Sequence, residues 1–408
     1  MKMRLYLYDD PADAPRFLPF SDSRPIGELR YGAWTLRERV ERAGFQIAGH
    51  VGAAHLAGFT EPDAPPVVPA TTADGARLYL RSSFAFDVEQ DFATGLAASG
   101  SGPFRLTDGA GATVGALLPA GTSWPGPAGI DASRPSVALR GKLLRGVWEV
   151  VGDLVPTLRS DLALVLSSHL PTQVPAGSTV MGDAAGLIVE DGVQVEPQVV
   201  FDLRNGPIWI HSGAQIRTFS RLAGPLVVGP GTRIVGGQIR ESSLGPKCVV
   251  HGEVSNTIFL GYANKSHDGF VGHSIVGRWA NLGAGTITSN LKNTYGPVRL
   301  TLGGTKHETG LTFLGSLVGD HVKTAIGTML PTGCAIGTGA NVFGGRRPEP
   351  VVPPFAWGTD EPADVLSCQR FVEIAERVMP RRDITVDEAM RSYLKAVWRA
   401  ATGRGECD

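Results

Sequence analysis

The feature that most constrains the fold of this chain is a six-residue spacing of aliphatic residues in its second half. One unbroken series consists of Ile210, Ile216, Leu222, Val228 and Ile234. A helix repeats about every 3.6 residues and a strand about every two, so neither places all five side chains on one face. A period of six fits a β-solenoid, in which one aliphatic residue of each hexad points inward and small residues occupy the turns. The sequence therefore predicts a left-handed parallel β-helix.

The same rhythm extends the predicted β-helix toward the C-terminus. Val276 and Leu282 keep the spacing, and each is followed by a glycine. A later series consists of Val318, Leu330, Ile336 and Val342, with Gly327, Gly333, Gly339 and Gly345 in step. Because three hexads complete one triangular coil, residues about eighteen positions apart are expected on adjacent coils. We expect the β-helix to span residues 175–350.

Residues 1–170 have a different sequence pattern, in which short apolar runs alternate with segments of helical periodicity. Strands are expected in 3–10 (MRLYLYDD) and 76–84 (ARLYLRSSF), and helices in 28–44 (ELRYGAWTLRERVERAG) and 143–166. This mixture predicts an α/β domain of the nucleotidyltransferase type. The Gly-, Ser- and Pro-rich segment 98–137 is expected to be a loop.

Residues 360–408 are predicted to form a C-terminal helical tail. Two amphipathic helices are expected there, with Asp383 and Thr385 near the start of the second and acidic residues in its first turn. We expect these helices to pack against the solenoid or against a neighbouring subunit.

The charge balance and the cysteines limit the compartment and the classes of partner. With 38 basic and 39 acidic residues the formal net charge is −1, so bulk electrostatics do not favour nucleic acid, although a local phosphate pocket is compatible with this balance. No apolar run approaches the roughly 20 residues of a membrane span. The cysteines are scattered, at Cys248, Cys334, Cys368 and Cys407. We expect reduced thiols in a cytoplasmic protein that contacts neither membrane nor nucleic acid.

Residues suited to chemistry gather in the stretch 265–274, KSHDGFVGHS. Transfer of an acyl group to an amine or a hydroxyl needs a general base and hydrogen-bond donors for the developing oxyanion. Histidine suits the role of base because it titrates near neutral pH. His267 falls one predicted coil before Gly285, which makes it the candidate base. His273 is expected to support it or to be structural.

The coil that follows carries almost no side chains at the matching position. Gly283, Ala284 and Gly285 leave space beside His267 for the pantetheine arm of acetyl-CoA or for a sugar, and their N–H groups are candidate oxyanion donors. The alternative is that these small residues only fill solenoid turns. The histidine spacing matches no usual metal-ligand motif.

The stretch 264–300, NKSHDGFVGHSIVGRWANLGAGTITSNLKNTYGPVRL, resembles the acetyltransferase half of bifunctional UDP-N-acetylglucosamine diphosphorylase/glucosamine-1-phosphate N-acetyltransferases. The similarity is greatest to a divergent branch of that family, which is characterised by LYDD-like and RPIGELRYGAWTLRE-like segments. Both are present here, at 7–10 and 24–38, as is VPPFAWG at 352–358. The resemblance therefore covers most of the chain.

The resemblance implies roles for individual residues of the β-helix. His267 corresponds to the catalytic base, Asn281 to an asparagine that contacts the sugar, and Ala284 to a position that lines the acetyl-CoA site. Phe270 and Leu291 stand where the usual enzymes carry tyrosines that contact the sugar phosphate, so two hydroxyl donors are missing. These departures leave the identity of the acceptor open.

Other implied features concern the phosphate, the cofactors and the assembly. Lys265 and Lys292 are candidates for holding the sugar phosphate in place of the missing tyrosines. The resemblance also implies acetyl-CoA and UTP as co-substrates, and a homotrimer with active sites between neighbouring solenoids.

The N-terminal domain lacks the glycine-rich phosphate loop of ordinary sugar-phosphate nucleotidyltransferases. It offers SDSRPIGELRYG, in which Arg24 and Arg30 are six residues apart. Two guanidinium groups can clamp phosphates bidentately, although an Arg-rich turn leading into a surface helix is an equal interpretation. Asp9 and Asp10 end the first strand and are the candidate nucleotide-site carboxylates, with Asp10 as a ligand of Mg²⁺.

These features together predict an enzyme of sugar-nucleotide biosynthesis that N-acetylates glucosamine 1-phosphate and then joins the product to UTP. One alternative is an acyltransferase for another sugar nucleotide, with an N-terminal domain that only binds nucleotide. A second is a non-enzymatic scaffold that binds a sugar phosphate and regulates a partner.

Overall fold

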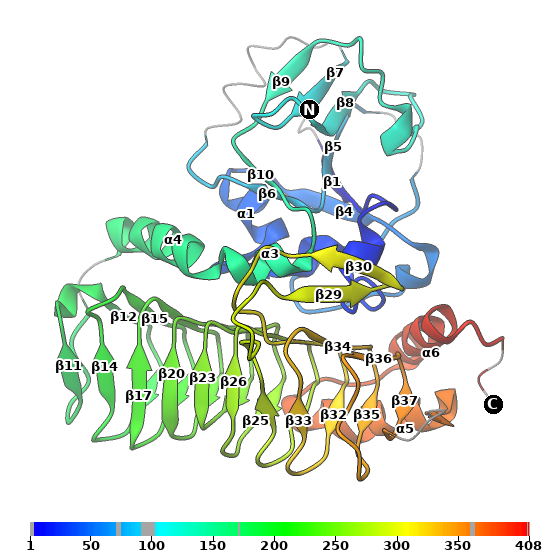
Figure 1. The fold of residues 1–408 in the computed structure, drawn as a ribbon. Coiled ribbons are helices and arrows are strands. Elements are labelled where there is room, and N and C mark those ends of the chain that lie inside the picture. Colours follow the sequence, from blue (N-terminus) through cyan, green and yellow to red (C-terminus); the bar gives the residue numbers. More distant parts are fainter. Residues whose placement is uncertain are drawn as a thin grey trace.

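The computed structural model describes residues 4–70, 75–90, 103–169, 172–359, 364–405 and 407. An α/β domain lies along one side of a β-solenoid, and the C-terminal helices pack at the far end of the solenoid (Figure 1). This arrangement confirms the predicted fold class of an α/β domain, a parallel β-helix and a helical tail. None of the helices in the described ranges has the length and apolar character needed to cross a membrane.

The α/β domain is built on a six-stranded mixed sheet. Its strands, in spatial order, are β4 (Ile47–Val51), β1 (Arg4–Tyr8), β5 (Arg77–Arg81), β8 (Thr113–Leu118), β7 (Phe104–Thr107) and β9 (Ser136–Ala138). β1 pairs in parallel with β4 and β5, whereas β8 runs antiparallel to both of its neighbours. The two strands expected from the sequence are confirmed.

The expectation of a loop over 98–137 is wrong for β7, β8 and β9, while residues 98–102 lie outside the described residues. The glycines of this segment do not all mark turns. Gly115 lies inside β8, where a Cβ atom would collide with the carbonyl oxygen of Tyr79 on β5. Close approach of two strands, rather than a turn, explains this glycine.

The helix expected over 28–44 is shorter than predicted. Only α1 (Leu36–Arg42) is helical, and Thr35 begins it with a capping box: its Oγ1 accepts from the Glu38 amide at 3.0 Å, and the Glu38 carboxylate accepts from the Thr35 amide at 2.7 Å. The preceding residues form a tight hairpin of β2 (Arg30–Tyr31) and β3 (Trp34–Thr35). Gly32 makes its turn with φ of 71°.

The helix predicted over 143–166 is present as two consecutive segments, α3 (Val147–Gly152) and α4 (Leu154–Ser168). The buried face of α4 shares one apolar cluster with Ile188 and Trp209 of the solenoid.

A short antiparallel pair of strands, β6 (Phe84–Phe86) and β10 (Gly141–Leu143), precedes the helices α3 and α4. The remaining short helices are η1 (Ala14–Arg16), η2 (Ile26–Glu28), η3 (Ala54–Leu56), η4 (Pro127–Gly129), η5 (Ala184–Gly186) and η6 (Met379–Arg382). The helices α3 and α4 lie between the α/β sheet and the solenoid (Figure 1).

The solenoid consists of three parallel sheets. The first contains β11 (Thr179–Met181), β14 (Val200–Asp202), β17 (Ser220–Ala223), β20 (Gly237–Arg240), β23 (Glu253–Ser255) and β26 (Phe270–Gly272). The second contains β12 (Leu187–Val189), β15 (Ile208–Ile210), β18 (Leu226–Val228), β21 (Ser243–Leu244), β24 (Ile258–Phe259), β27 (Ile275–Val276), β31 (Ser316–Val318), β34 (Cys334–Ile336) and β36 (Val351–Val352). The third begins with β13 (Gln194–Val195), β16 (Gln215–Ile216), β19 (Arg233–Ile234), β22 (Val249–Val250) and β25 (Asn264–Lys265).

The third sheet continues through a bridge at Asn281 into β32 (Lys323–Thr324), β35 (Asn341–Val342), β37 (Ala356–Trp357) and β38 (Asp364–Val365). A separate pair, β28 (Ile287–Thr288) and β33 (Met329–Leu330), completes the later coils. All eleven aliphatic residues of the six-residue series lie in the buried core of the solenoid. The prediction that they point inward is confirmed.

The coils differ in length, which the six-residue period does not reveal. Ile216 pairs with Ile234, eighteen residues later, but Val250 pairs with Lys265 and Asn264 with Asn281, at steps of fifteen and seventeen. Shorter turns between the faces absorb the missing residues. The register of any two residues therefore depends on the particular coil.

A hairpin interrupts the solenoid between β28 and β31. Its strands are β29 (Arg299–Leu302) and β30 (Thr305–Glu308), and it rises from the solenoid toward α3 (Figure 1). Leu300 and Leu302 join the same apolar cluster as Phe17, Phe20 and Trp148 of the α/β domain. The hairpin thus fixes the α/β domain against the solenoid.

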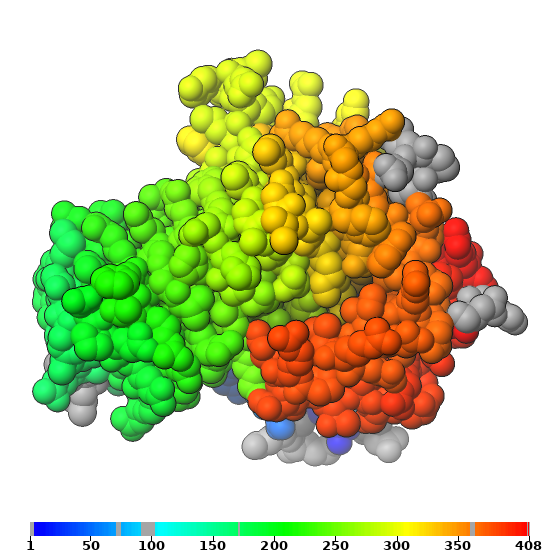
Figure 2. All heavy atoms as spheres, turned by 90° about the horizontal axis from the view of Figure 1, so that it is seen from below, coloured from blue at the N-terminus to red at the C-terminus, as the bar shows by residue number. Residues whose placement is uncertain are grey.

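The tail consists of α5 (Cys368–Val378) and α6 (Glu388–Thr402). The second helix begins later than Asp383 and Thr385, because Asp387 is its N-cap and accepts from the Met390 amide at 2.8 Å. The tail packs on Tyr262, Trp279 and Phe355 of the solenoid and covers its C-terminal end in Figure 2. The predicted packing against the solenoid is confirmed.

A disulfide joins the start of α5 to the end of the chain. Cys368 and Cys407 are bonded, with Cα atoms 4.9 Å apart, whereas Cys248 and Cys334 are free and buried. The expectation that all four thiols are reduced is therefore wrong for one pair. Their separation of 39 residues matches no spacing motif, so only the packing of the tail brings them together.

We expect thiol titration of the denatured, unreduced chain to find two thiols, from Cys248 and Cys334, and four after reduction. Peptide mapping without reduction should recover the peptide that joins Cys368 to Cys407. Four reactive thiols before reduction would contradict the disulfide.

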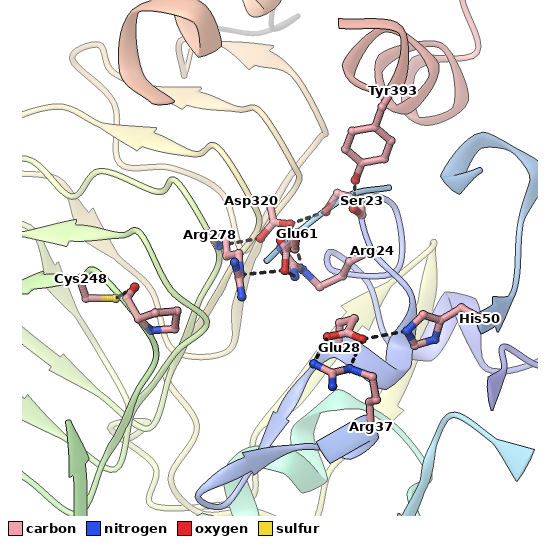
Figure 3. Close-up of polar contacts among 11 residues, drawn as sticks. Ser23, Arg24, Glu28, Arg37, His50, Glu61, Cys248, Arg278, Asp320 and Tyr393 are labelled. Carbon is pink, nitrogen blue, oxygen red and sulfur yellow. Dashed lines mark hydrogen bonds and ion pairs between the residues drawn. The ribbon is translucent and has the colours of Figure 1, made fainter. Parts of the chain in front are cut away.

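One buried ion network ties the three parts of the chain together (Figure 3). The Arg24 guanidinium donates to Asp320 of the solenoid at 2.7 and 3.0 Å and pairs with Glu61 at 3.0 Å. Arg278 contacts the same two acids, through its side chain to Glu61 at 3.0 Å and through its amide to Asp320 at 2.7 Å. The Tyr393 hydroxyl of the tail donates to the main-chain oxygen of Ser23. The α/β domain, the solenoid and the tail therefore meet at one polar cluster.

Replacement Arg24→Ala should lower the free energy of unfolding by about 3–5 kcal/mol, because the buried Asp320 carboxylate loses its guanidinium partner and Glu61 keeps only Arg278. Urea unfolding followed by tryptophan fluorescence measures this loss. Arg299→Ala is the matched control, since Arg299 pairs with Glu308 on the surface and exposed pairs contribute little. Equal effects of the two substitutions would contradict the role of the network.

Candidate functional site

His267 lies at an exposed corner of the β-helix, between β25 and β26. The neighbouring coil is seventeen residues away here, since Asn264 pairs with Asn281 and the Gly285 amide donates to the Asp268 oxygen at 3.0 Å. His267 is therefore level with Ala284. The expectation that it lies over Gly285 is off by one residue, because it assumed a coil of eighteen.

The small residues of the next coil have two different reasons to be small. At Gly283 a Cβ atom would lie 2.6 Å from the backbone of Ala325, and Gly285 has φ of 69°. Both glycines are thus required by the solenoid itself. The amides of these glycines also bond within the coils, whereas the Ala284 N–H has no acceptor among the described residues. The Ala284 N–H is therefore available to donate a hydrogen bond to a ligand.

Lys265 occupies an inward position of the β-helix. It follows Val250 in the core column of the third sheet, is 2% exposed, and donates from Nζ to the main-chain oxygen of His267. Burial lowers the pKa of Lys265 to about 8. The prediction that Lys265 holds a sugar phosphate is corrected by this placement. Its ammonium group anchors the corner that presents His267.

Asn281 belongs to a polar row on the outer side of the third sheet. The Asn264 amide donates to the Asn281 side-chain oxygen at 2.7 Å, and Lys323 follows Asn281 on the next coil. Lys323 donates to the main-chain oxygens of Trp279 and His321, each at 2.9 Å, and burial lowers its pKa to about 8. The sequence did not reveal Lys323, because the inserted hairpin separates it from Asn281 by 42 residues.

The other residues predicted on the β-helix lie beyond the His267 corner. Phe270 is half-buried on β26, and the Lys292 ammonium donates to the Pro297 oxygen at 2.6 Å within the following loop. His273 stacks on Phe313, with ring centroids 5.1 Å apart, and burial lowers its pKa to about 4. A neutral, stacked imidazole fits the predicted structural role of His273.

In the N-terminal domain, carboxylates gather at the carboxyl ends of β1 and β5. Asp9 accepts from the Ile26 amide at 3.2 Å, and burial raises the pKa of its carboxyl to about 6. Asp10 pairs with Arg81 at 3.1 Å. Arg81 also donates to Asp13, which is buried and accepts from Ser83 at 2.5 Å. The sequence missed Arg81, which becomes a neighbour of Asp10 only when β5 pairs with β1. It also missed Asp13, which lies one turn after Asp10, where its amide donates to the Asp10 oxygen at 2.8 Å.

The predicted phosphate clamp of Arg24 and Arg30 is not formed. Arg24 is 2% exposed and belongs to the ion network with Asp320. Arg30 donates to the Ala33 oxygen at 2.5 Å and to Ser243 of the solenoid at 3.2 Å. Both guanidinium groups contact or face the solenoid, so the structure does not pair them over Asp9 and Asp10.

A magnesium ion at Asp10 would need further ligand atoms from a bound nucleotide. Within the described ranges, no group of three or more His, Cys, Asp or Glu side chains is placed to share a metal ion. Magnesium in nucleotide sites is held by one or two carboxylates together with phosphate oxygens. Asp9 and Asp10 fit that limited role, since both stand at the edge where ligands of α/β sheets bind.

Several known proteins are similar to parts of this chain. Residues 5–169 match the family model of sugar nucleotidyl transferases. The bifunctional protein GlmU of Methanococcus vannielii is 37% identical over 86 residues, which cover 21% of this chain and 20% of that protein. The bifunctional sugar-1-phosphate nucleotidylyltransferase/acetyltransferase of Sulfurisphaera tokodaii is 30% identical over 93 residues, 23% of each chain. GlmU of Bordetella parapertussis is 28% identical over 204 residues, 46% of this chain and 42% of that protein.

These matches span less than half of the length of each relative. Among solved structures, a hexapeptide transferase family protein from Anaplasma phagocytophilum aligns with 55% of this chain and 90% of its own, at 12% identity and a TM-score of 0.23. A segment that is similar to sugar nucleotidyl transferases, residues 5–169, is thus followed by a parallel β-helix. Parts of the chain are similar to bifunctional sugar nucleotidyltransferase/acetyltransferases, as the sequence indicated.

Replacement Lys265→Met should preserve or raise the thermal midpoint, because a buried ammonium group is exchanged for an apolar side chain of similar length. Hydrogen exchange of the amides in residues 266–269 should become about tenfold faster, since the corner loses its anchor. Lys306→Met on the exposed strand β30 is the control and should change neither quantity. An unchanged exchange rate at 266–269 would contradict the anchoring role of Lys265.

Proposed function

We propose that the β-helix transfers an acetyl group from acetyl-CoA to the amine of glucosamine 1-phosphate. The observation that carries this proposal is the pairing of an exposed, anchored histidine with a free backbone donor. His267 stands at a corner held by Lys265, level with the Ala284 N–H, which has no acceptor among the described residues. A base and an oxyanion donor side by side are what acyl transfer requires.

In this mechanism the His267 imidazole takes a proton from the acceptor amine as the nitrogen attacks the thioester carbonyl. The new N–C bond forms, the C–S bond breaks, and CoA leaves as the thiol after taking up the proton. The Ala284 N–H stabilises the negative charge that develops on the carbonyl oxygen. Asn281 lies one coil beyond the β25 strand that leads to His267, and its side-chain amide orients the sugar.

The sugar phosphate requires a cation near the same corner. Lys265 is excluded by its position in the core. Lys292 remains the proposed partner of the phosphate, because its loop follows the coil that carries Ala284 and its ammonium group bonds only to a main-chain oxygen of that loop among the described residues. When the phosphate binds, the Lys292 ammonium group exchanges the neutral Pro297 oxygen for a negatively charged phosphate oxygen as its acceptor.

We further propose that the N-terminal domain joins the acetylated sugar phosphate to UTP and releases pyrophosphate. The match of residues 5–169 to sugar nucleotidyl transferases supports this activity. In this proposal Arg81, which pairs with Asp10 and Asp13 at the ends of the strands, contacts the triphosphate. Magnesium held by Asp9 and Asp10 would offset the negative charge of the phosphates.

A homotrimer with sites between neighbouring solenoids is part of this proposal. Apolar side chains are exposed on the coils that follow His267, with Ile326 83%, Met329 62% and Ile287 44% exposed. Such a cluster is typical of a surface covered by another chain. Association there would enclose the His267 corner and exclude water from it.

A second function is favoured by Phe270 and Leu291, which supply no hydroxyl groups to a sugar phosphate. In that alternative the β-helix acylates a different sugar nucleotide, and the N-terminal domain binds the nucleotide without turnover. The same base and oxyanion donor serve both reactions.

Replacement His267→Ala should lower acetyl-CoA-dependent release of CoA with glucosamine 1-phosphate by at least about a hundredfold, because general-base catalysis supplies that order of rate. The thermal midpoint should not change, since His267 is exposed. His169→Ala, at an exposed histidine that ends α4, is the control and should retain activity. Wild-type CoA release by His267→Ala would overturn the assignment of the base.

Pyrophosphate release with UTP is followed in the same assay. CoA release without pyrophosphate would leave the acetyl transfer standing and reduce the N-terminal domain to a binding domain. Turnover with another amino sugar nucleotide, but not with glucosamine 1-phosphate, would favour the second function.

A further inference from the structure

A groove of about 650 Å³ lies between the N-terminal domain and the solenoid, away from both proposed active sites. The hairpin β2–β3 and helix α1 form one wall, with Arg30, Trp34 and Arg42. The solenoid forms the other wall, with Trp209 and His211. The candidate residues at His267 and at the β1 carboxylates do not line it. Its volume is in the range of sites for small organic ligands.

Two guanidinium groups in this groove have no carboxylate partner. No acid of the described residues lies within ion-pairing distance of Arg30 or Arg42. Among the described residues, Arg30 bonds only to Ser243 and to the Ala33 oxygen, and Arg42 lies over the Trp34 ring at 4.0 Å. Burial lowers the pKa of both groups, and the nearby carboxylates of Glu38 and Asp161 offset only part of that effect.

The acids that line the same groove are already engaged or lie at its rim. Glu28 and Glu41 both bond to Arg37, at 2.7 and 2.5 Å. Glu38 accepts from the Thr35 amide in the capping box, and Asp63 is exposed. The two guanidinium groups therefore form no direct ion pair in the described part of the chain, although the groove contains carboxylates.

Flat aromatic surfaces lie beside these cations. The rings of Trp209 and His211 are 3.9 Å apart, and burial lowers the pKa of His211 to about 4, so the imidazole is neutral near pH 7. The Trp34 indole N–H is buried without an acceptor in the described part of the chain. Aromatic faces accept a planar ring, and guanidinium groups accept phosphate oxygens.

We propose that this groove binds a nucleoside phosphate, with the base against Trp209 and His211 and the phosphates on Arg30 and Arg42. Because the phosphate ligands come from the N-terminal domain and the aromatic surface from the solenoid, the bound nucleotide bridges the two. This role is independent of the proposed catalytic functions. A nucleotide that binds only when the two walls are together stabilises their contact by mass action.

Isothermal titration of the full chain with ADP tests this site, since ADP is not a substrate of the proposed reactions. Arg42→Gln should weaken binding about tenfold or more, because one charged phosphate contact is lost, and Arg42→Lys should weaken it less. Arg399→Gln, at an exposed arginine of α6, is the matched control and should bind ADP as the wild type does. Thermal midpoints of the variants exclude a general loss of folding.

Photolabelling with 8-azido-ADP identifies the groove directly. Label in residues 30–42 or 207–231 that excess ADP displaces, and that Arg42→Gln loses, supports the proposal. Label confined to residues 9–26 and 77–83, or equal ADP binding by Arg42→Gln, would overturn it. If pyrophosphate binds as tightly as ADP, the aromatic part of the proposal is wrong, and if adenosine does, the phosphate part is.

Discussion

The arrangement of this molecule depends on the buried pairing of Arg24 with Asp320 and Glu61. A charge of this kind is costly to remove from water, and only a complete set of partners compensates for it. Asp320 belongs to the solenoid, Glu61 to the α/β domain, and Arg278 returns from the solenoid to bond both acids. The network is complete only when the α/β domain and the solenoid are in place, so it specifies their relative position. The groove that we assign to a nucleotide lies beside it and shares Arg278.

A second constraint operates inside the β-helix. Apart from the coil that carries the hairpin β29–β30, coils of fifteen to twenty-one residues follow one another without loss of the core, because each strand still contributes one inward side chain. At one coil that side chain is Lys265, whose ammonium group holds the His267 corner from within. A lysine in an apolar column lowers stability, and its placement under a functional corner is a physical reason for its presence.

The sequence predicted those parts of the fold that depend on a local period. The six-residue series found the solenoid because an inward aliphatic side chain per hexad is a local requirement. It did not find the disulfide, since the two cysteines are 39 residues apart and meet only in the packed tail. It also did not find the local hairpin β29–β30 or strands β7–β9, because these do not follow the six-residue period. The same limit applies to the sites. His267 was expected over Gly285 and lies level with Ala284, one residue away. Lys323 and Arg81 were missed because only coil length and strand pairing bring them to Asn281 and Asp10.

The central claim is that the corner at His267 and the amide of Ala284 form one acyl-transfer site. A crystal structure of the full chain with acetyl-CoA bound tests it most directly. The account predicts the thioester oxygen at about 3 Å from the Ala284 nitrogen, with the His267 imidazole facing the carbonyl carbon across a space for the acceptor amine. Acetyl-CoA bound on a different coil, with His267 directed away from the thioester, would contradict it.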